Sequence, residues 1–141
     1  GKLSGILLES AGAAGQVATL AIGIGINLAA APDPQAVEAG ATRPVSLLGE
    51  TGLAVIPDEF LDALACQFDQ YHAQLRAYGF GPIRNAWMAR AAKLGETIVA
   101  RTGTAETSGR FDGIDDSGAL ILTGPRGRQT IPAADIYFSG T

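Results

Sequence analysis

The hydrophobic period of the sequence changes at Gly95, and this change constrains the fold more than any other feature. Before Gly95, apolar residues recur at steps of three and four over residues 57–78, which predicts a long helix that ends at Gly79. A second helix is expected over residues 81–94, because Pro82 suits the first helical turn. After Gly95, short β-type runs lie at residues 97–101, 107–114, 119–122, 129–131 and 135–138. These short strands predict a small SH3-like β-barrel.

Two apolar runs open the chain and predict a hairpin. Residues 2–9 predict a strand that leads into a turn of small residues at 10–15. Residues 17–27 predict a second strand, and apolar residues at both parities are expected of a strand covered on both faces of a sheet. Residues 29–53 are rich in alanine, proline and glycine, which favours a loop with a short helix near residues 46–49. The expected fold class is therefore α/β or α+β, with a mixed sheet followed by the small barrel.

The composition argues against several classes of function. With 141 residues, 47% of them hydrophobic, the chain can bury one core and a small second module. Its net charge of -4 argues against DNA or RNA binding by this chain. No apolar run is long enough for a membrane-spanning helix. Cys66 is the single cysteine, which rules out an internal disulfide and fits a reducing compartment, by default the cytoplasm.

Two segments near the amino end combine residue types that could hold a ligand. Lys2 precedes a strand in which Gly5 lets a ligand approach the backbone, although a lysine at a strand start is more often a solvated charge. Gly23 and Gly25 alternate along the second strand, so both lie on one face and leave it without side chains. That face suits either a flat ligand or the close packing of another backbone. A dinucleotide fingerprint is excluded, because no third glycine follows at the required spacing.

Several other residues have ordinary structural explanations. His72 is expected on the surface, because it has no acid, cysteine or histidine partner at ligand spacing. Asp112, Asp115 and Asp116 look like a metal cluster, but Asp-Asp-Ser-Gly is typical of a turn between strands. Cys66 falls on the side of the long helix opposite its apolar stripe and lacks a catalytic partner. Four aromatic residues at helical spacing are expected in the core: Phe60, Phe68, Tyr71 and Trp87.

Three separate segments together resemble the biotin protein ligase family. The match is in order, spacing and residue types, and it involves KLSGILLE at residues 2–9, IGIGINL at 22–28 and GRFDGIDDSGALIL at 109–122. The resemblance covers nearly the whole chain. It implies a central α/β domain that holds biotin and ATP, continued here over residues 1–94, and a carboxyl-terminal SH3-like domain over residues 95–141.

The resemblance also implies which residues touch biotin. Lys2 matches the lysine of the family's KxxGIL motif, which contacts the biotin carboxylate and the α-phosphate. A point charge suits this chemistry, because negative charge builds on the phosphorus oxygens during acyl adenylation. Gly5 and Ile6 would present backbone groups to the biotin rings, and Gly25 would leave room beside them.

Residues near the adenylate follow from the same resemblance. Asn27 matches an asparagine that the family uses near the adenine and ribose, although an asparagine there could equally close a turn through its own side chain. Pro44 and Val45 lie where some members place a tryptophan against the adenine. This chain has no aromatic residue there, so an aliphatic cover is expected.

The implied activity is the formation of biotinyl-5'-AMP from biotin and ATP, followed by transfer of biotin to a lysine of a biotin carboxyl carrier protein. The family's phosphate loop and its Trp-Pro-Asn-Asp motif precede the KxxGIL lysine, and the sequence contains neither. The chain, which starts without methionine, is therefore expected to be a fragment that is inactive alone, with the Mg²⁺ that accompanies ATP bound outside it. Two alternatives stay open: a non-catalytic interaction or homodimerisation module that uses an exposed sheet edge, and a lipoate-type acyltransferase.

Overall fold

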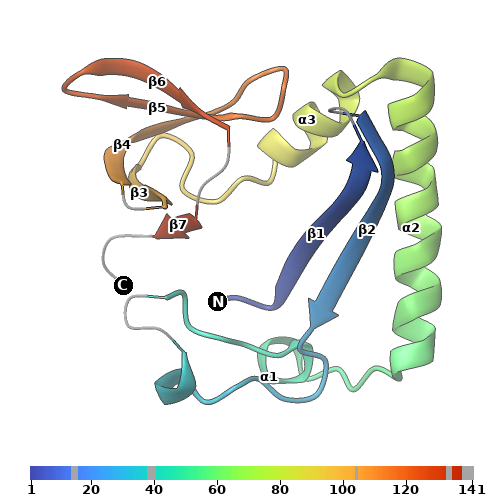
Figure 1. The fold of residues 1–141 in the computed structure, drawn as a ribbon. Coiled ribbons are helices and arrows are strands. Elements are labelled where there is room, and N and C mark those ends of the chain that lie inside the picture. The colour runs from blue at the N-terminus through green and yellow to red at the C-terminus, as the bar shows by residue number, and fades with distance from the viewer. Residues whose placement is uncertain (14–15, 38–40, 104, 133–134, 138–141) are drawn as a thin grey trace. The chain divides into compact units, whose positions relative to one another are not determined.

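The chain divides into two compact units, Gly1–Leu61 and Asp62–Thr141, which are described separately. The computed structural model describes residues 1–13, 16–37, 41–103, 105–132 and 135–137. The dividing point falls inside α2 (Pro57–Tyr78), the long helix in Figure 1. The expected domain boundary between residues 94 and 95 stays a prediction.

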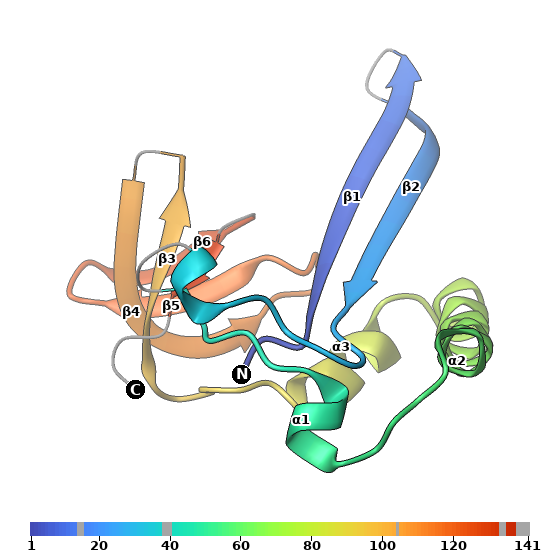
Figure 2. The same cartoon turned by 90° about the horizontal axis from the view of Figure 1, so that it is seen from below.

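A long antiparallel hairpin dominates the first unit. Strands β1 (Ser4–Ala13) and β2 (Gln16–Ile26) pair along their length, as Figure 2 shows, so the predicted hairpin is confirmed. The turn expected over residues 10–15 is wrong for residues 10–13, which continue β1. Small residues without proline keep the backbone free to pair, and Ser10 lies opposite Leu20 in the ladder.

The two faces of the hairpin differ in composition. Residues that share a face alternate along each strand, so the glycines of β2 lie on one face and its isoleucines on the other. The isoleucine face carries apolar side chains that are 37% to 67% exposed: Ile6, Leu8, Leu20, Ile22 and Ile24. Coverage of β2 on both faces is therefore not observed among the described residues of this unit, where β1 and β2 form a two-stranded sheet.

Short helices occupy the segment after the hairpin. A 3-10 turn η1 (Pro34–Ala36) comes first, and α1 (Leu47–Thr51) confirms the short helix expected near residues 46–49. The Ser46 hydroxyl caps α1 by accepting a hydrogen bond from the Gly49 amide at 3.1 Å. Gly52, with φ of 74°, ends the helix in the left-handed conformation that glycine adopts without strain.

Helix α2 matches its predicted bounds, and Gly79 follows it with φ of 73°. No residue of α2 is buried in the described chain, and Phe68 and Tyr71 are 48% and 40% exposed. The expectation that the aromatic stripe forms a core is therefore wrong here. Periodicity identified the helix and its apolar face but not what covers that face. No helix of the described residues is long and apolar enough to cross a membrane.

Helix α3 (Gly81–Met88) is shorter than the predicted helix over residues 81–94. The chain leaves the helix after Met88 and turns through Lys93, whose φ is 63°. This turn lets Ala91 pack on the core of the strands that follow, and it lets the Gly95 amide donate to the Phe111 carbonyl at 2.8 Å. Tertiary contacts therefore end the helix earlier than its local pattern indicates.

Helix α3 lies against strand β4 (Ala105–Ile114). The Arg84 guanidinium donates to the Ile114 carbonyl at 2.8 Å, and Trp87 meets Phe111 edge to face with ring centroids 6.2 Å apart. Trp87 is nevertheless 47% exposed, so its expected place in the core is only partly observed.

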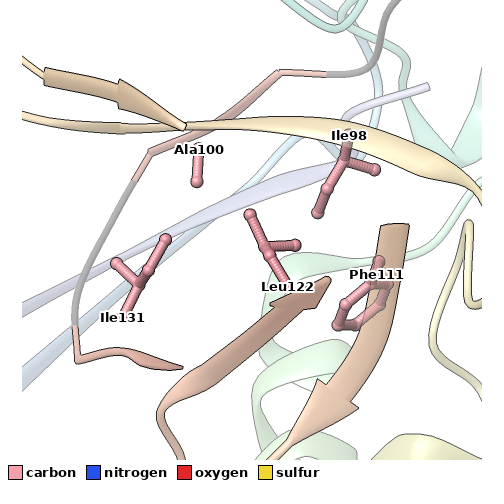
Figure 3. Packing of buried hydrophobic residues seen from close by; sticks show 5 residues of the cluster. All are labelled: Ile98, Ala100, Phe111, Leu122 and Ile131. Carbon is pink, nitrogen blue, oxygen red and sulfur yellow. The ribbon is translucent and has the colours of Figure 1, made fainter. Parts of the chain in front are cut away.

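All five predicted short strands are present in the second unit. They are β3 (Thr97–Thr102), β4, β5 (Leu120–Gly124), β6 (Gly127–Ile131) and β7 (Asp135–Tyr137), in the sheet order β6-β5-β4-β3-β7. Every neighbouring pair is antiparallel, which is consistent with the expected SH3-like fold. In Figure 3 the core side chains point into one space between the strands: Ile98, Ala100, Phe111, Leu122 and Ile131.

Candidate functional site

Backbone hydrogen bonds join three separate parts of the chain at the base of the hairpin. The Lys2 amide donates to the Arg43 carbonyl at 2.8 Å, and the Val45 amide donates to the Lys2 carbonyl at 3.1 Å. The Asn27 amide donates to the Leu3 carbonyl at 3.0 Å. The start of the chain, the end of β2 and the segment before α1 are therefore held together at this point.

Asn27 links these parts through its side chain as well. Its Nδ2 donates to the Val45 carbonyl at 3.0 Å, and its own carbonyl accepts from the Leu47 amide at 2.8 Å. The side chain thus reaches a residue far along the sequence rather than closing a turn with its own neighbours. Its Oδ1 accepts no hydrogen bond from the described residues and is the atom that remains available to a ligand.

Pro44 and Val45 are buried in the base of the hairpin, and Val45 is 9% exposed. A Cβ built on Gly1 would lie 2.1 Å from Cγ1 of Val45, which shows how closely the two segments pack. In this conformation the side chains of both residues are buried and do not face solvent. An adenine cover made from their side chains would require this segment to open.

Bare backbone lies on the glycine face of the hairpin. Gly5 is opposite Gly25, and a Cβ built on Gly5 would meet nothing within 4 Å. A Cβ on Gly25 would have the Gly5 carbonyl oxygen as its nearest neighbour, at 4.0 Å. Ile6 belongs to the opposite face, so it can offer this side only its backbone groups. Of the two possibilities for a glycine face, the geometry at Gly5 and Gly25 favours room for a ligand over close packing of a backbone.

Lys2 lies two residues before the start of β1, and its backbone forms an isolated parallel bridge with Pro44. Its side chain is exposed and makes no ion pair with the residues that the structure describes. A cation without a protein partner can serve a negatively charged ligand without first breaking an ion pair. Sequence reasoning missed the role of Arg43, whose carbonyl fixes Lys2, because backbone pairing between distant segments leaves no local signal.

The acids of the second unit have structural roles. Asp115 Oδ1 accepts hydrogen bonds from the Ser117 amide at 2.8 Å, the Ser117 hydroxyl at 2.7 Å and the Ala119 amide at 2.9 Å, so the predicted turn is confirmed. The Ser117 hydroxyl and these two amides lower the pKa of Asp115. Asp116 is exposed and lies 3.9 Å from Nε of Arg84.

Asp112 connects two strands of the sheet. It accepts from the Thr123 hydroxyl at 2.6 Å and from Nε of Arg110 at 2.7 Å. Both contacts lower the pKa of Asp112, and the hydrogen bond from the Thr123 hydroxyl has the larger effect. The alternation of Arg110 and Asp112 along one strand was a usable signal for this pair, because such residues share a face.

His72 and Cys66 are on the surface, as predicted. His72 stacks on Phe68 with ring centroids 6.2 Å apart. Among the described residues, Cys66 has only the side-chain amide of Gln70 beside it, at 3.7 Å. Neither residue lies in the part of the chain that forms the base of the hairpin.

Comparisons with known proteins identify similar sequences among biotin ligases. Residues 93–139 match the family described as "Biotin protein ligase C terminal domain". A biotin–(acetyl-CoA-carboxylase) ligase from Paracoccus denitrificans is 66% identical over 140 residues, which are 99% of this chain and 58% of that protein. The bifunctional ligase/repressor BirA of Bacillus subtilis is 31% identical over 96% of this chain and 41% of its own length. The chain thus spans about half the length of the curated relatives that it matches.

Solved structures show the same fold. A mutant biotin protein ligase from Aquifex aeolicus in complex with biotin superposes with a TM-score of 0.81, covering 97% of this chain and 56% of that one. The Aquifex aeolicus ligase in complex with biotin and ATP superposes with a TM-score of 0.76, covering 95% and 54%. Both are 20% identical in sequence, so they support the fold alone.

Proposed function

We propose, since this chain belongs to the biotin protein ligases and matches their C-terminal portion, that it is part of an enzyme that joins biotin to a carrier protein. In the proposed reaction the biotin carboxylate attacks the α-phosphorus of ATP, and pyrophosphate leaves. An amine of a lysine on a biotin carboxyl carrier protein then attacks the carbonyl of biotinyl-5'-AMP, and AMP leaves. The 66% identity to the Paracoccus denitrificans ligase, over 99% of this chain, supports this activity.

One observation carries the assignment to residues: Lys2, which is exposed and makes no ion pair with the described residues, lies two residues before β1, and Gly5 of that strand is paired with Gly25 of β2. Lys2 is the proposed catalytic residue. Its ammonium would attract the biotin carboxylate and the α-phosphate and offset the charge that builds during attack. Gly5, Ile6 and Gly25 would line the biotin rings with backbone atoms.

Asn27, Pro44 and Val45 would form the adenylate side of the same wall. The free Oδ1 of Asn27 can accept a hydrogen bond from a ribose hydroxyl while Nδ2 keeps its bond to Val45. The buried Pro44 and Val45 would support the adenine by positioning the segment before α1.

The sequence contains neither the phosphate loop nor the Trp-Pro-Asn-Asp motif that the resemblance implies, so we expect no adenylation by these 141 residues alone. Mg²⁺ would accompany ATP on residues outside this chain. Residues 1–94 would continue the catalytic domain and 95–141 would form the SH3-like domain, in a cytoplasmic protein.

A chimera tests the proposal. The 141 residues replace the matching part of the Paracoccus denitrificans ligase, and biotinylation of a carrier domain is measured with radiolabelled biotin. We expect the chimera to be active and Lys2→Gln to lower adenylate formation by about 100-fold, the usual cost of losing one charge-stabilising group. Lys93→Gln is the matched control, because Lys93 is paired with Glu96 at the surface and distant in sequence from the site.

Two results would count against the proposal. A folded but inactive chimera beside an active parent ligase would reject the enzymatic function. If Lys2→Gln lowers the melting temperature enough to account for its loss of activity, the catalytic role of Lys2 is rejected, while the proposed enzymatic function still stands.

A non-catalytic interaction or homodimerisation module is the second candidate, and the exposed isoleucine face of the hairpin favours it. This second candidate predicts that the chimera folds but does not biotinylate the carrier domain. The lipoate-type alternative is disfavoured, because the match over residues 93–139 is to a biotin protein ligase domain.

A further inference from the structure

A small polar cavity opens at one end of the five-stranded sheet, apart from the hairpin residues assigned above. Its volume is about 180 Å³. Its lining residues come from the start of β4, from the turn between β5 and β6, and from β6 itself. The residues that the argument uses are Glu106, Thr107, Ser108, Arg126 and Gln129.

The cavity is lined by hydrogen-bond donors that other residues do not occupy. The hydroxyl of Thr107, the amide of Gln129 and the guanidinium of Arg126 make no side-chain hydrogen bond to any described residue. Thr107 and Gln129 are also half-buried, so they have restricted access to water. Thr107 and Gln129 share the inward side of their strands with Phe111 and Ile131, whereas Ser108 faces the other way. Donors that other residues do not occupy are what a negatively charged oxygen requires.

The charges around the cavity favour the same ligand class. Glu106 is the acid in the lining, and it is paired with Arg101, so its charge is largely compensated. Arg126 is the cation in the lining and makes no ion pair within the described chain. The local balance is therefore positive in a chain whose net charge is -4.

We propose that this cavity binds a single oxyanion group, either a phosphate or a carboxylate, with Arg126 as the charged anchor. Pockets that bury drug-sized ligands have volumes of about 300–1,000 Å³. A cavity of about 180 Å³ is smaller and suits one functional group rather than a whole nucleotide. The planar guanidinium of Arg126 can donate two parallel hydrogen bonds to such a group.

Nuclear magnetic resonance of the 141-residue chain tests the inference. Inorganic phosphate and acetate are titrated separately at constant ionic strength, and the backbone amides of Thr107 and Ser108 and the side-chain amide of Gln129 are followed. We expect saturable shifts at these groups with at least one anion. Saturation with phosphate alone identifies a phosphate site, and saturation with acetate alone identifies a carboxylate site.

A matched pair of variants separates the cavity from general surface charge. Arg126→Ala should weaken the affinity about tenfold or more, because it removes the charge-assisted hydrogen bonds. Arg128→Ala removes the same charge from the same hairpin, but Arg128 lies outside the lining and acts on Asp112. The affinity of the Arg128→Ala variant for the anion should stay within about twofold of the wild type.

The inference is overturned if neither anion gives saturable shifts, or if Arg126→Ala and Arg128→Ala weaken binding equally. Thr107→Val provides a second variant that keeps every charge and removes one hydroxyl donor, and it should also lower the affinity. Unchanged affinity in both Arg126→Ala and Thr107→Val would likewise reject the cavity as the binding site. The spectra of the variants report at the same time that the sheet is folded.

Discussion

Replacing Asn27 tests whether one side chain holds the base of the hairpin together. Asn27→Ala removes the 3.0 Å hydrogen bond from Nδ2 to the Val45 carbonyl. A typical hydrogen bond contributes about 0.5–1.5 kcal/mol, and leaving a buried acceptor unpaired costs about 1–3 kcal/mol. Val45 is 9% exposed, and Asn27 is the donor to its carbonyl in the described chain, so the larger range applies. Asn27→Asp should cost more, because it places a carboxylate against a carbonyl oxygen.

Amide hydrogen exchange is the appropriate assay, because the tryptophan and tyrosines lie outside the first unit and do not report on it. The Lys2, Val45 and Leu47 amides all donate hydrogen bonds across the base. A loss of about 1–3 kcal/mol should make them exchange about 5–150-fold faster.

Asn85→Ala is the matched control, because Asn85 is exposed on α3 and its side chain makes no hydrogen bond to the described residues. It should leave the three amides of the base unchanged. Wild-type exchange rates in Asn27→Ala would refute the reasoning, since the side chain would then contribute nothing to holding the segments together. Equal protection in Asn27→Asp and the wild type would refute the geometry of the hydrogen bond.

Two further predictions follow from the glycine face and from the acids of the sheet. In the chimera, Gly25→Val should abolish binding of biotinyl-5'-AMP, measured by calorimetry, with little change in melting temperature, because its Cβ meets only the Gly5 carbonyl oxygen at 4.0 Å. Folding lowers the pKa of Asp115, so its stabilising effect is present above the ordinary carboxyl pKa of about 3.9 and is lost as pH falls through the lowered value. Asp115→Asn should flatten the acid limb of the stability profile, measured by thermal unfolding against pH, and an unchanged limb would contradict the assignment.

Local patterns in the sequence predicted most of the secondary structure. The helix over residues 57–78 and all five short strands follow from spacing and turn residues, because near neighbours determine backbone conformation in such segments. The errors occurred where distant residues decide the outcome. Helix α3 ends early because Ala91 packs on the sheet, and residues 10–13 extend β1 because β2 offers them hydrogen-bond partners.

The same distinction between local and distant contacts applies to the candidate site. Lys2, Gly5 and Gly25 were identifiable from residue types and from the resemblance to biotin protein ligases, since a charge before a strand and glycines at alternate positions are local features. The pairing of Lys2 with Pro44 was not identifiable, because it joins segments far apart in the chain. The polar cavity beside Arg126 had no signal in the sequence for the same reason.

The sequence by itself determined most of the helices and strands, the two positions of β2 that lack side chains, and the family that the chain resembles. Those properties depend on residues a few positions apart, whose spacing is readable without coordinates. Only the tertiary structure decided that Asn27 binds the Val45 carbonyl and that Val45 is buried. Such contacts depend on how distant segments close on one another, and the side chains that satisfy a buried carbonyl can come from anywhere in the chain.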